Sequence, residues 1–287
     1  SKKKLNKNFH VGYSPERIDP GYSKYKLSNQ IKVISGSSKQ TVARIGKIYK
    51  RIIKKGIFVA KNIKVAEAAK IIENTQRDIN IAFINEVSML FHKMKINTNE
   101  VLKAANTKWN FLNFKPGLVG GHCIGVDPHY LAYKSLELGH VPEIILAGRN
   151  LNDGMSNYVS KRLLSKMNQI QINPVRAKIL ILGYTFKENC NDTRNTKVQD
   201  LYVHVRSFCS DVEVYDPFIE ELDNDPININ FVQKPTIESK KYDAVILAVA
   251  HDEFKEMGPS IRSLLKDPGL IYDLKYLLPK ELVDLRL

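Results

Sequence analysis

The sequence predicts an α/β protein that combines a long central helix with a carboxyl-terminal parallel sheet. Apolar runs over 177–183, 212–217 and 242–250 alternate with helical patterns. This alternation is typical of parallel strands joined by crossover helices, with ligands bound at the carboxyl ends of the strands. From Val65 to about Lys95, without Gly or Pro, apolar residues recur every three or four positions. That pattern predicts one helix of roughly 45 Å.

The remaining elements follow from the same kinds of pattern. Residues 1–64 mix short strands with one helix over 40–55, which we expect Gly56 to close. Further helices are predicted over 130–138, 155–167 and 195–208, and a further strand over 270–273. We therefore expect three domains, with boundaries at 1–64, 65–168 and 169–287.

Length and composition limit the class of protein. A chain of 287 residues with 43% hydrophobic content can bury a sizeable core. Three cysteines without framework spacing favour free thiols in a reducing compartment, so we expect a cytoplasmic location. The longest apolar run, Ala244 to Ala250, is seven residues, which fits neither a signal peptide nor a membrane span. No membrane partner is expected.

The net charge of +14 is concentrated at the start of the chain. Residues 1–70 hold 18 Lys and Arg against 3 Asp and Glu, and the remainder holds 26 against 27. Such a block can bind nucleic acid or an anionic surface. These lysines are interleaved with strand-like runs and have no aromatic stacking platform, so we expect a solvated face or the edge of a larger domain, and no nucleic-acid partner.

The segment 117–127 is the most informative stretch for chemistry. Four glycines surround Cys123, and Asp127 follows four positions later. Glycines allow close backbone approach to a substrate, and a thiol in a polar loop can ionise and attack an electrophilic carbon. The alternative is a zinc site made by His122, Cys123, Asp127 and His129. Adjacent His122 and Cys123 cannot easily point at one ion, so we expect no metal.

Two further groups of polar residues allow two readings each. Lys70 and Asn74 share a face of the long helix, as a functional pair or as part of a solvated stripe. The strand over 177–183 runs into a turn that lacks the G-x-G-x-x-G of dinucleotide sites. There Lys187 and Arg194 suit phosphate or ribose contact by charge, or are surface charges on a loop.

Together these motifs resemble the UDP-glucose/GDP-mannose dehydrogenase family. The segments that carry the resemblance are 13–18 (YSPERI), 66–74 (AEAAKIIEN), 120–127 (GGHCIGVD) and 186–194 (FKENCNDTR). The run 109–117 (WNFLNFKPG) looks like the bacterial UDP-N-acetylhexosamine 6-dehydrogenases, of GlcNAc/GalNAc type, of capsule and O-antigen synthesis. The resemblance covers about residues 9–278. It implies that residues 1–64 are a truncated remnant of an NAD-binding Rossmann domain, of which roughly 150 residues would precede Ser1.

The resemblance implies an NAD-dependent double oxidation of the primary alcohol of a UDP-N-acetylhexosamine to the uronic acid. Cys123 then captures the intermediate aldehyde as a thiohemiacetal, which becomes a thioester and is hydrolysed. Lys70 matches the residue that stabilises the oxyanion or exchanges protons, and Asn74 the one that holds a water. Glu16 matches a carboxylate that assists proton transfer, and Asp127 one that positions water and Lys70.

The resemblance also implies the binding residues. Arg194 is expected near the NAD phosphates. Residues expected at the sugar nucleotide are Asn110, Phe111, Leu112, Lys115, Gly120, Gly121, Phe186, Lys187 and Lys275. Lys275 stands where UDP-glucose dehydrogenases carry arginine, and Pro20 where some relatives carry a second glutamate. We therefore expect a 2-acetamido sugar, with UDP-glucose or UDP-ManNAc as alternative substrates.

Two expectations concern the chain as a whole. Without a complete NAD site, the alternative to an enzyme is a noncatalytic nucleotide-sugar-binding fragment. The chain is expected to end in a Rossmann-like UDP-binding domain. It is also expected to form a homodimer through the long helix. The apolar stripe expected at that dimer contact consists of Ala68, Ile72, Ile79, Ala82 and Leu90.

Overall fold

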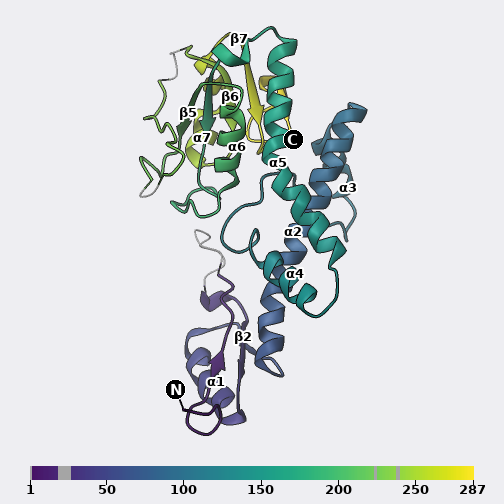
Figure 1. Ribbon diagram of the computed structural model, residues 1–287, viewed down its shortest axis with the longest axis vertical. Helices are drawn as coiled ribbons and strands as arrows, with labels where there is room; N and C mark the ends of the chain where they lie inside the picture. Colours follow the sequence, from purple (N-terminus) through teal and green to yellow (C-terminus); the bar gives the residue numbers. More distant parts are fainter. Residues whose placement is uncertain (1, 19–26, 223–224, 237–239) are drawn as a thin grey trace. The chain divides into compact units, whose positions relative to one another are not determined.

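The structure of this chain is a computed structural model, and it describes residues 2–18, 27–222, 225–236 and 240–287. The chain divides into two compact units, Ser1–Gln76 and Arg77–Leu287. Figure 1 shows a mixed α/β chain with long helices and a carboxyl-terminal sheet. The predicted fold class is therefore confirmed.

The first unit contains a small sheet of order β1-β2-β3. Strand β2 (Lys32–Gly36) pairs in parallel with β3 (Ile57–Val59) and antiparallel with β1 (Gly12–Tyr13). Helix α1 (Lys39–Ile52) joins β2 to β3, and a short 3₁₀ turn, η2, spans Leu27–Asn29. The unit therefore contains one β-α-β crossover of the kind found in parallel sheets.

The predicted end of the first helix was wrong. Helix α1 stops at Ile52, and Ile53 is extended and buried, with its N–H bonded to the carbonyl of Tyr49. Gly56, at φ +92°, instead serves a turn that leads into β3. Burial of Ile53 ends the helix before the glycine is reached.

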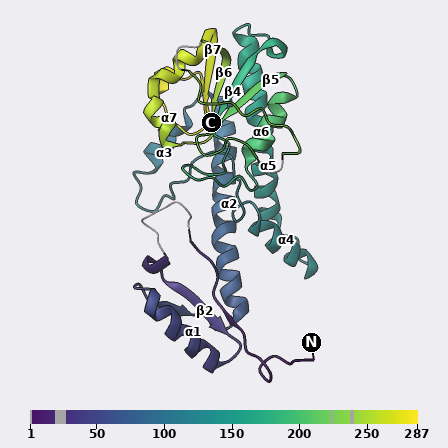
Figure 2. The ribbon, with the colours of Figure 1, turned by 90° about the vertical axis from the view of Figure 1, so that its left-hand side faces the viewer.

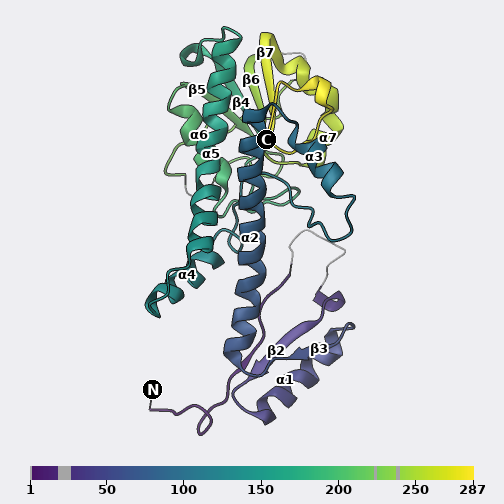
Figure 3. The same cartoon turned by 90° about the vertical axis from the view of Figure 1, so that its right-hand side faces the viewer.

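The predicted long helix is confirmed as α2 (Ile63–Met94), and the boundary between the two units falls inside it. In the second unit, α2 from Arg77 onward lies beside α5 (Glu143–Gln169) in both side views (Figure 3). The two helices are joined by an ion pair of 2.6 Å between Arg149 and Asp78. The shorter helices α3 (Thr98–Ala105) and α4 (Asp127–Glu137) complete the helical part.

Helix α5 begins twelve residues before the predicted start at 155. The sequence pattern hides the beginning of this helix because it contains Gly148 and the buried polar residues Arg149 and Asn152. A Cβ added to Gly148 would lie 3.5 Å from Ile79 and 3.6 Å from Ala82, so this small residue lets α2 and α5 approach closely. Helix α4 likewise starts earlier than predicted, because Asp127 and Pro128 occupy its first turn.

The carboxyl-terminal sheet has the order β5-β4-β6-β7-β8, and every pairing in it is parallel. Its strands are β4 (Lys178–Leu182), β5 (Asp211–Tyr215), β6 (Tyr242–Leu247), β7 (Leu265–Asp273) and β8 (Leu285–Arg286). Its helices are α6 (Lys197–Arg206), α7 (Asp252–Met257) and the 3₁₀ segments η3 (Pro174–Arg176), η4 (Gly258–Leu264) and η5 (Lys280–Leu282). The four strands predicted here are confirmed, and α6 is shorter than expected because Thr196 caps it.

Both faces of this sheet are covered, as Figure 2 shows. Ile179 and Ile181 of β4 join a core with α5 and α6, whereas Leu180 and Leu182 join a second core with α7 and η4. This double burial explains the continuous apolar runs in the sequence. It leaves the two ends of the strands as the places where polar groups gather.

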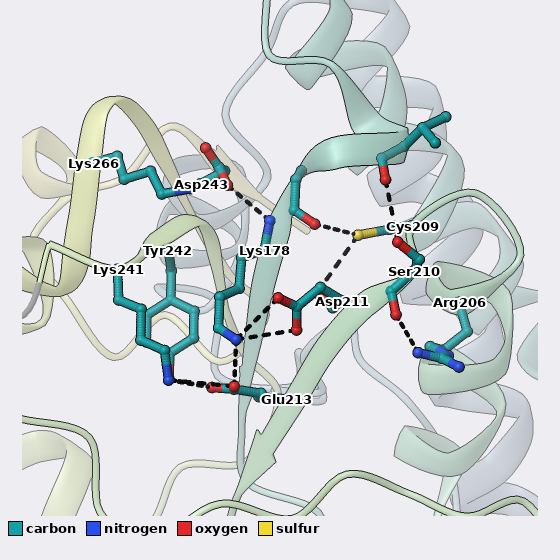
Figure 4. Close-up of polar contacts among 12 residues, drawn as sticks. Lys178, Arg206, Cys209, Ser210, Asp211, Glu213, Lys241, Tyr242, Asp243 and Lys266 are labelled. Atoms are coloured by element: carbon teal, nitrogen blue, oxygen red, sulfur yellow. Dashed lines mark hydrogen bonds and ion pairs between the residues drawn. The ribbon is translucent and has the colours of Figure 1, made fainter.

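A polar cluster occupies the amino-terminal ends of β4, β5 and β6 (Figure 4). The Glu213 carboxylate accepts a hydrogen bond of 2.6 Å from the Tyr242 hydroxyl and pairs with Lys178 at 2.5 Å and Lys241 at 3.3 Å. Burial alone would raise the pKa of Glu213, but these three partners outweigh it and bring that pKa below its usual value. The cluster joins three strands at the amino-terminal edge of the sheet, opposite to the edge formed by their carboxyl ends.

Among the described residues, the helices include none with the length and apolar character needed to span a membrane.

Candidate active site

Cys123 lies in the turn that leads into α4. The cysteine is half-buried. Its backbone carbonyl oxygen accepts hydrogen bonds from the N–H groups of Val126 and Asp127 at 3.1 and 2.8 Å. The thiol therefore belongs to a folded turn just before the amino-terminal end of a helix. The partial positive charge at such an end favours a nearby anion, including a thiolate.

The start of the cysteine loop is fixed by a fully buried side chain of α2, Asn85. Its amide donates to the carbonyl of Gly117 at 3.0 Å and its oxygen accepts the N–H of Gly117 at 2.8 Å. The same amide donates to Asn152 at 2.9 Å, and Asn152 in turn donates to Asp78 at 2.8 Å. A chain of buried polar groups from α2 and α5 therefore holds the loop at its first glycine.

The second anchor of the loop comes from the segment between β4 and α6. The N–H of Gly121 donates to the carbonyl of Asn195 at 3.1 Å. A Cβ on Gly120 would lie 2.5 Å from that same carbonyl oxygen, and a Cβ on Gly121 would lie 2.8 Å from the ring of Phe186. Gly121 also has a φ of +86°. Both positions therefore require glycine.

The same segment carries charged groups near the cysteine loop. The guanidinium of Arg194 donates to Asp192 at 2.9 Å, and Asp192 lies 3.7 Å from the ring nitrogen of His122. The hydrogen bond from Arg194 lowers the pKa of Asp192. The hydrogen bond and the charge of Asp192 raise the pKa of Arg194, and an ionised Cys123 adds a smaller coulombic contribution. The guanidinium is therefore within electrostatic range of the sulfur.

Lys275 approaches the loop from the end of β7. Its ammonium lies 4.0 Å from the position that a Cβ on Gly117 would take. Burial lowers the pKa of Lys275, and the carboxylates of Glu188 and Asp273 oppose that shift. The structure therefore brings Lys275 from the end of β7, and Phe186 and Arg194 from the segment after β4, to the cysteine loop.

The loop over 110–115, which is expected to line the sugar nucleotide, is largely exposed. Leu112 is 55% exposed, and Asn110 and Lys115 are also exposed, whereas Phe111 is half-buried. Lys187 is half-buried beside Phe186. On the α5 and α6 side of the cysteine loop lies a cavity of about 300 Å³, whose lining includes Gly121, Val126, Arg149, Asp153 and Lys197.

Glu16, Lys70 and Asn74 belong to the first unit, Ser1–Gln76. Glu73, which precedes Asn74 on α2, forms a two-bond ion pair with Arg17, with distances of 2.7 and 2.9 Å. Glu16 accepts the N–H groups of Arg17 and Ile18 at 2.7 and 2.8 Å. The segment that carries Glu16 is thus tied to the helix that carries Lys70 and Asn74. Pro20 lies outside the described residues.

Sequence reasoning missed the residues that support the site from behind. Asn85, Asn152 and Asp78 are buried polar residues in helices. Their one signal in the sequence is a polar side chain on a helix face that is otherwise apolar. In the described part of the chain, no group of three His, Cys, Asp or Glu side chains is arranged to hold a metal ion, and this includes the four residues of the zinc alternative.

A cysteine in a glycine turn is thus docked against the carboxyl ends of strands in a parallel α/β sheet, which is the edge where such sheets bind ligands. Sequence profiles of the UDP-glucose/GDP-mannose dehydrogenase family match the chain twice, the central domain at residues 64–154 and the UDP binding domain at 180–280. The chain is 50% identical over 286 residues to UDP-N-acetyl-D-glucosamine 6-dehydrogenase of Salmonella typhi, covering 99% of this chain and 67% of that protein. The enzyme of the same name from Pseudomonas aeruginosa is 51% identical over the same coverage.

A solved structure of a UDP-D-ManNAc dehydrogenase from Pyrococcus horikoshii has a similar fold, with a TM-score of 0.81 and 28% identity. It is matched over 95% of this chain and 62% of that one. The chain thus spans about two thirds of the length of these relatives. It belongs to the UDP-glucose/GDP-mannose dehydrogenase family.

Proposed function

We propose that this chain carries the nucleophile and the sugar-nucleotide site of a UDP-N-acetylhexosamine 6-dehydrogenase. Two relatives that are 50% and 51% identical to this chain over 286 residues act, by name, on UDP-N-acetyl-D-glucosamine. The observation that carries the proposal is the contact of Phe186 and Asn195 with Gly120 and Gly121, three and two residues before Cys123. It joins the UDP-binding domain to the cysteine loop within one unit. The role in capsule or O-antigen synthesis stays a prediction.

In this proposal Cys123 is the nucleophile. Its sulfur adds to the aldehyde at carbon 6 of the sugar, and the resulting thiohemiacetal is oxidised to a thioester that water hydrolyses to the carboxylate. Sulfur suits both steps because it is nucleophilic near neutral pH and its ester remains open to hydrolysis. Arg194 supports this role, since a guanidinium within range of the sulfur stabilises a thiolate.

The remaining catalytic roles follow the family motifs. Lys70 stabilises the oxyanion that forms on carbon 6, and Asn74 holds a water beside it. Glu16 assists proton transfer and Asp127 positions the hydrolytic water. The tie between Arg17 and Glu73 supports a shared role for Glu16 and Asn74, because it keeps their segments together.

Binding is proposed at the strand ends of the second unit. Phe186, Lys187 and Lys275 line the nucleotide sugar together with Gly120 and Gly121. The residues of the exposed loop, Asn110, Phe111, Leu112 and Lys115, close over it. Exposure of this loop supports that role, because such a loop is open to a ligand.

The described residues offer only part of a site for NAD. Arg194, whose side chain is 66% exposed, can receive a phosphate. The turn after β4 carries Lys187 where a pyrophosphate-binding turn carries glycines, so the described residues do not form a complete dinucleotide site. Two NAD molecules, bound one after the other, would each accept one of the two hydrides that leave carbon 6.

The binding half of the proposal is tested by calorimetry on this chain with UDP-GlcNAc. We expect Lys187→Ala to weaken binding about tenfold, through loss of one charged contact. Lys266→Ala, at the opposite edge of the sheet, is the matched control and should bind normally. If the unmodified chain binds no UDP-sugar, the proposal is wrong. Tighter binding of UDP-glucose or UDP-ManNAc than of UDP-GlcNAc would assign the substrate to that alternative sugar.

The catalytic half needs a chain with a complete NAD domain. We expect this chain alone to produce no NADH from UDP-GlcNAc and NAD, and a chimera with the amino-terminal third of the Salmonella typhi relative to produce it. In the chimera, Cys123→Ser should abolish acid formation while binding stays within a few fold, because the thiol acts after binding. Normal turnover by that variant would contradict the thioester route. A chimera without any turnover would favour the noncatalytic binder.

We also propose a homodimer through α2, on a corrected surface. Ala82 is 4% exposed and packs on α5, so it does not belong to the stripe predicted for the dimer contact. Its neighbour Phe83 is 57% exposed, and Leu90, seven residues on, is 53% exposed on the same helix face. Two large exposed apolar side chains on one helix face support self-association.

A further inference from the structure

A buried histidine joins the carboxyl ends of three strands directly beneath the site. His251, which follows β6, is fully buried, and its Nε2 lies 3.0 Å from Oδ2 of Asp216, which follows β5. The same carboxylate oxygen accepts the backbone N–H groups of Tyr184 and Thr185, which follow β4, at 2.6 and 3.0 Å. One carboxylate thus gathers the ends of β4, β5 and β6.

The second ring nitrogen of His251 faces the segment after β4. Nδ1 accepts the backbone N–H of Asn189 at 3.0 Å. Because Nδ1 accepts, the proton of the neutral ring lies on Nε2 and is donated to Asp216. The rings of Phe218 and Phe254 pack on the imidazole, with centroid distances of 5.2 and 5.4 Å. The ring is therefore held in one orientation and one tautomer.

The segment that His251 holds is closed on itself. Asn189 exchanges two hydrogen bonds with Asp252, at 2.8 and 3.0 Å, and has a left-handed φ of 55°. The hydroxyl of Thr185 donates to the carbonyl of Lys187 at 2.9 Å. Residues 185–189 therefore form a tight loop that contacts both ring nitrogens of His251: the N–H of Asn189 donates to Nδ1 at 3.0 Å, and the hydroxyl oxygen of Thr185 lies 3.2 Å from Nε2.

This loop presents Phe186 and Lys187 to the cysteine loop. The ring of Phe186 lies against Gly121, so closely that a Cβ there would be 2.8 Å from it, and edge-on to the ring of His122 at 6.0 Å. A shift of residues 185–189 would move Phe186 and Lys187 together. His251, through its bond to Asn189, therefore fixes the position of both side chains.

We propose that His251 is a positioning residue for nucleotide-sugar binding, which acts by holding the 185–189 loop through Asn189. The inference rests on the proposed function, since Phe186 and Lys187 are taken as substrate contacts. His251 itself has no exposed surface and does not touch the substrate. A histidine that served packing alone would need its ring and none of the polar contacts that the two ring nitrogens make with Asn189, Asp216 and Thr185.

Two conservative variants separate the contacts of Nδ1 from those of Nε2. His251→Asn can place an amide oxygen near Nδ1 and keeps the acceptor for Asn189, whereas His251→Gln can place an amide N–H near Nε2 and keeps the donor to Asp216. We expect His251→Gln to weaken UDP-GlcNAc binding by about tenfold and His251→Asn by less than about threefold. Tyr242→Phe, which removes a hydrogen bond at the opposite edge of the sheet, is the control for a loss of stability alone.

Hydrogen exchange provides a readout that needs no substrate. Peptides covering 185–190 should exchange faster in His251→Gln than in His251→Asn or Tyr242→Phe, at matched distance from each variant's melting temperature. If the unmodified chain binds no UDP-sugar, the proposed function fails, and the exchange pattern still decides whether His251 holds the loop. If both His251 variants weaken binding only in proportion to their loss of stability, as Tyr242→Phe does, the positioning role is overturned.

Discussion

Replacing Asn85 by alanine should lower the free energy of unfolding of the Arg77–Leu287 unit by about 2.5 kcal/mol. The change leaves three buried groups without their partner, namely the N–H and the carbonyl of Gly117 and the side-chain oxygen of Asn152. At about 1 kcal/mol for each group, the lower end of the usual range, the loss is about 3 kcal/mol. The better helix propensity of alanine returns about 0.5 kcal/mol.

Urea unfolding followed by circular dichroism measures this loss. With a slope of about 2.5 kcal/mol per molar urea, the midpoint should fall by about 1 M. The exposed neighbour on the same helix turn, Glu86→Ala, is the matched control and should change stability by less than about 0.5 kcal/mol. Equal midpoints for the two variants would refute the role of Asn85 as the anchor of the cysteine loop.

The same variant should loosen the loop locally. Hydrogen exchange of peptides covering 115–126 should become faster in Asn85→Ala and stay unchanged in Glu86→Ala, because Asn85 holds the backbone of Gly117 directly. Unchanged exchange in both variants, together with a large loss of stability, would show that Asn85 stabilises the helix pair and not the loop.

Three further predictions concern the glycine contact, the polar cluster and the dimer. Gly121→Ala should weaken UDP-GlcNAc binding, because the new Cβ would press on Phe186. The control is Gly139→Ala, at φ +78° with nothing within 4 Å, which should cost only the backbone strain of about 1 kcal/mol. Equal UDP-GlcNAc binding by both variants would refute the role of the contact between Gly121 and Phe186. The pKa of Glu213 is lowered in the folded chain, so its stabilisation is present above the unfolded pKa of about 4.3 and is lost as pH falls through the lower folded pKa. As the pH falls from 7 to 3, the unfolding midpoint should therefore fall less steeply in Glu213→Gln than in the unmodified chain. Parallel curves for the two proteins would contradict a stabilising role of the polar cluster around Glu213. Phe83→Glu should convert a dimer to a monomer in sedimentation at micromolar concentration, and a monomeric unmodified chain would exclude the dimer.

Elements with a strong local pattern could be predicted from the amino-acid sequence alone. The helix predicted over 65–95 is observed at Ile63–Met94, because an uninterrupted apolar period of three and four residues has no competing structure. The strands of the second unit were found because burial on both faces leaves continuous apolar runs. The glycines around Cys123 marked the loop, since close approach and positive φ both exclude a side chain.

Only the tertiary structure decided what supports that loop. Asn85 and Gly117 are 32 positions apart, and His251 and Asn189 are 62 apart, so no local pattern connects them. The early part of α5 was missed for a related reason. Its Arg149 and Asn152 look solvent-facing in the sequence, and they are buried where Asp78 and Asn85 on α2 provide hydrogen-bond partners for them. A polar residue is buried when a partner reaches it, and the partner is chosen by the packing of distant segments.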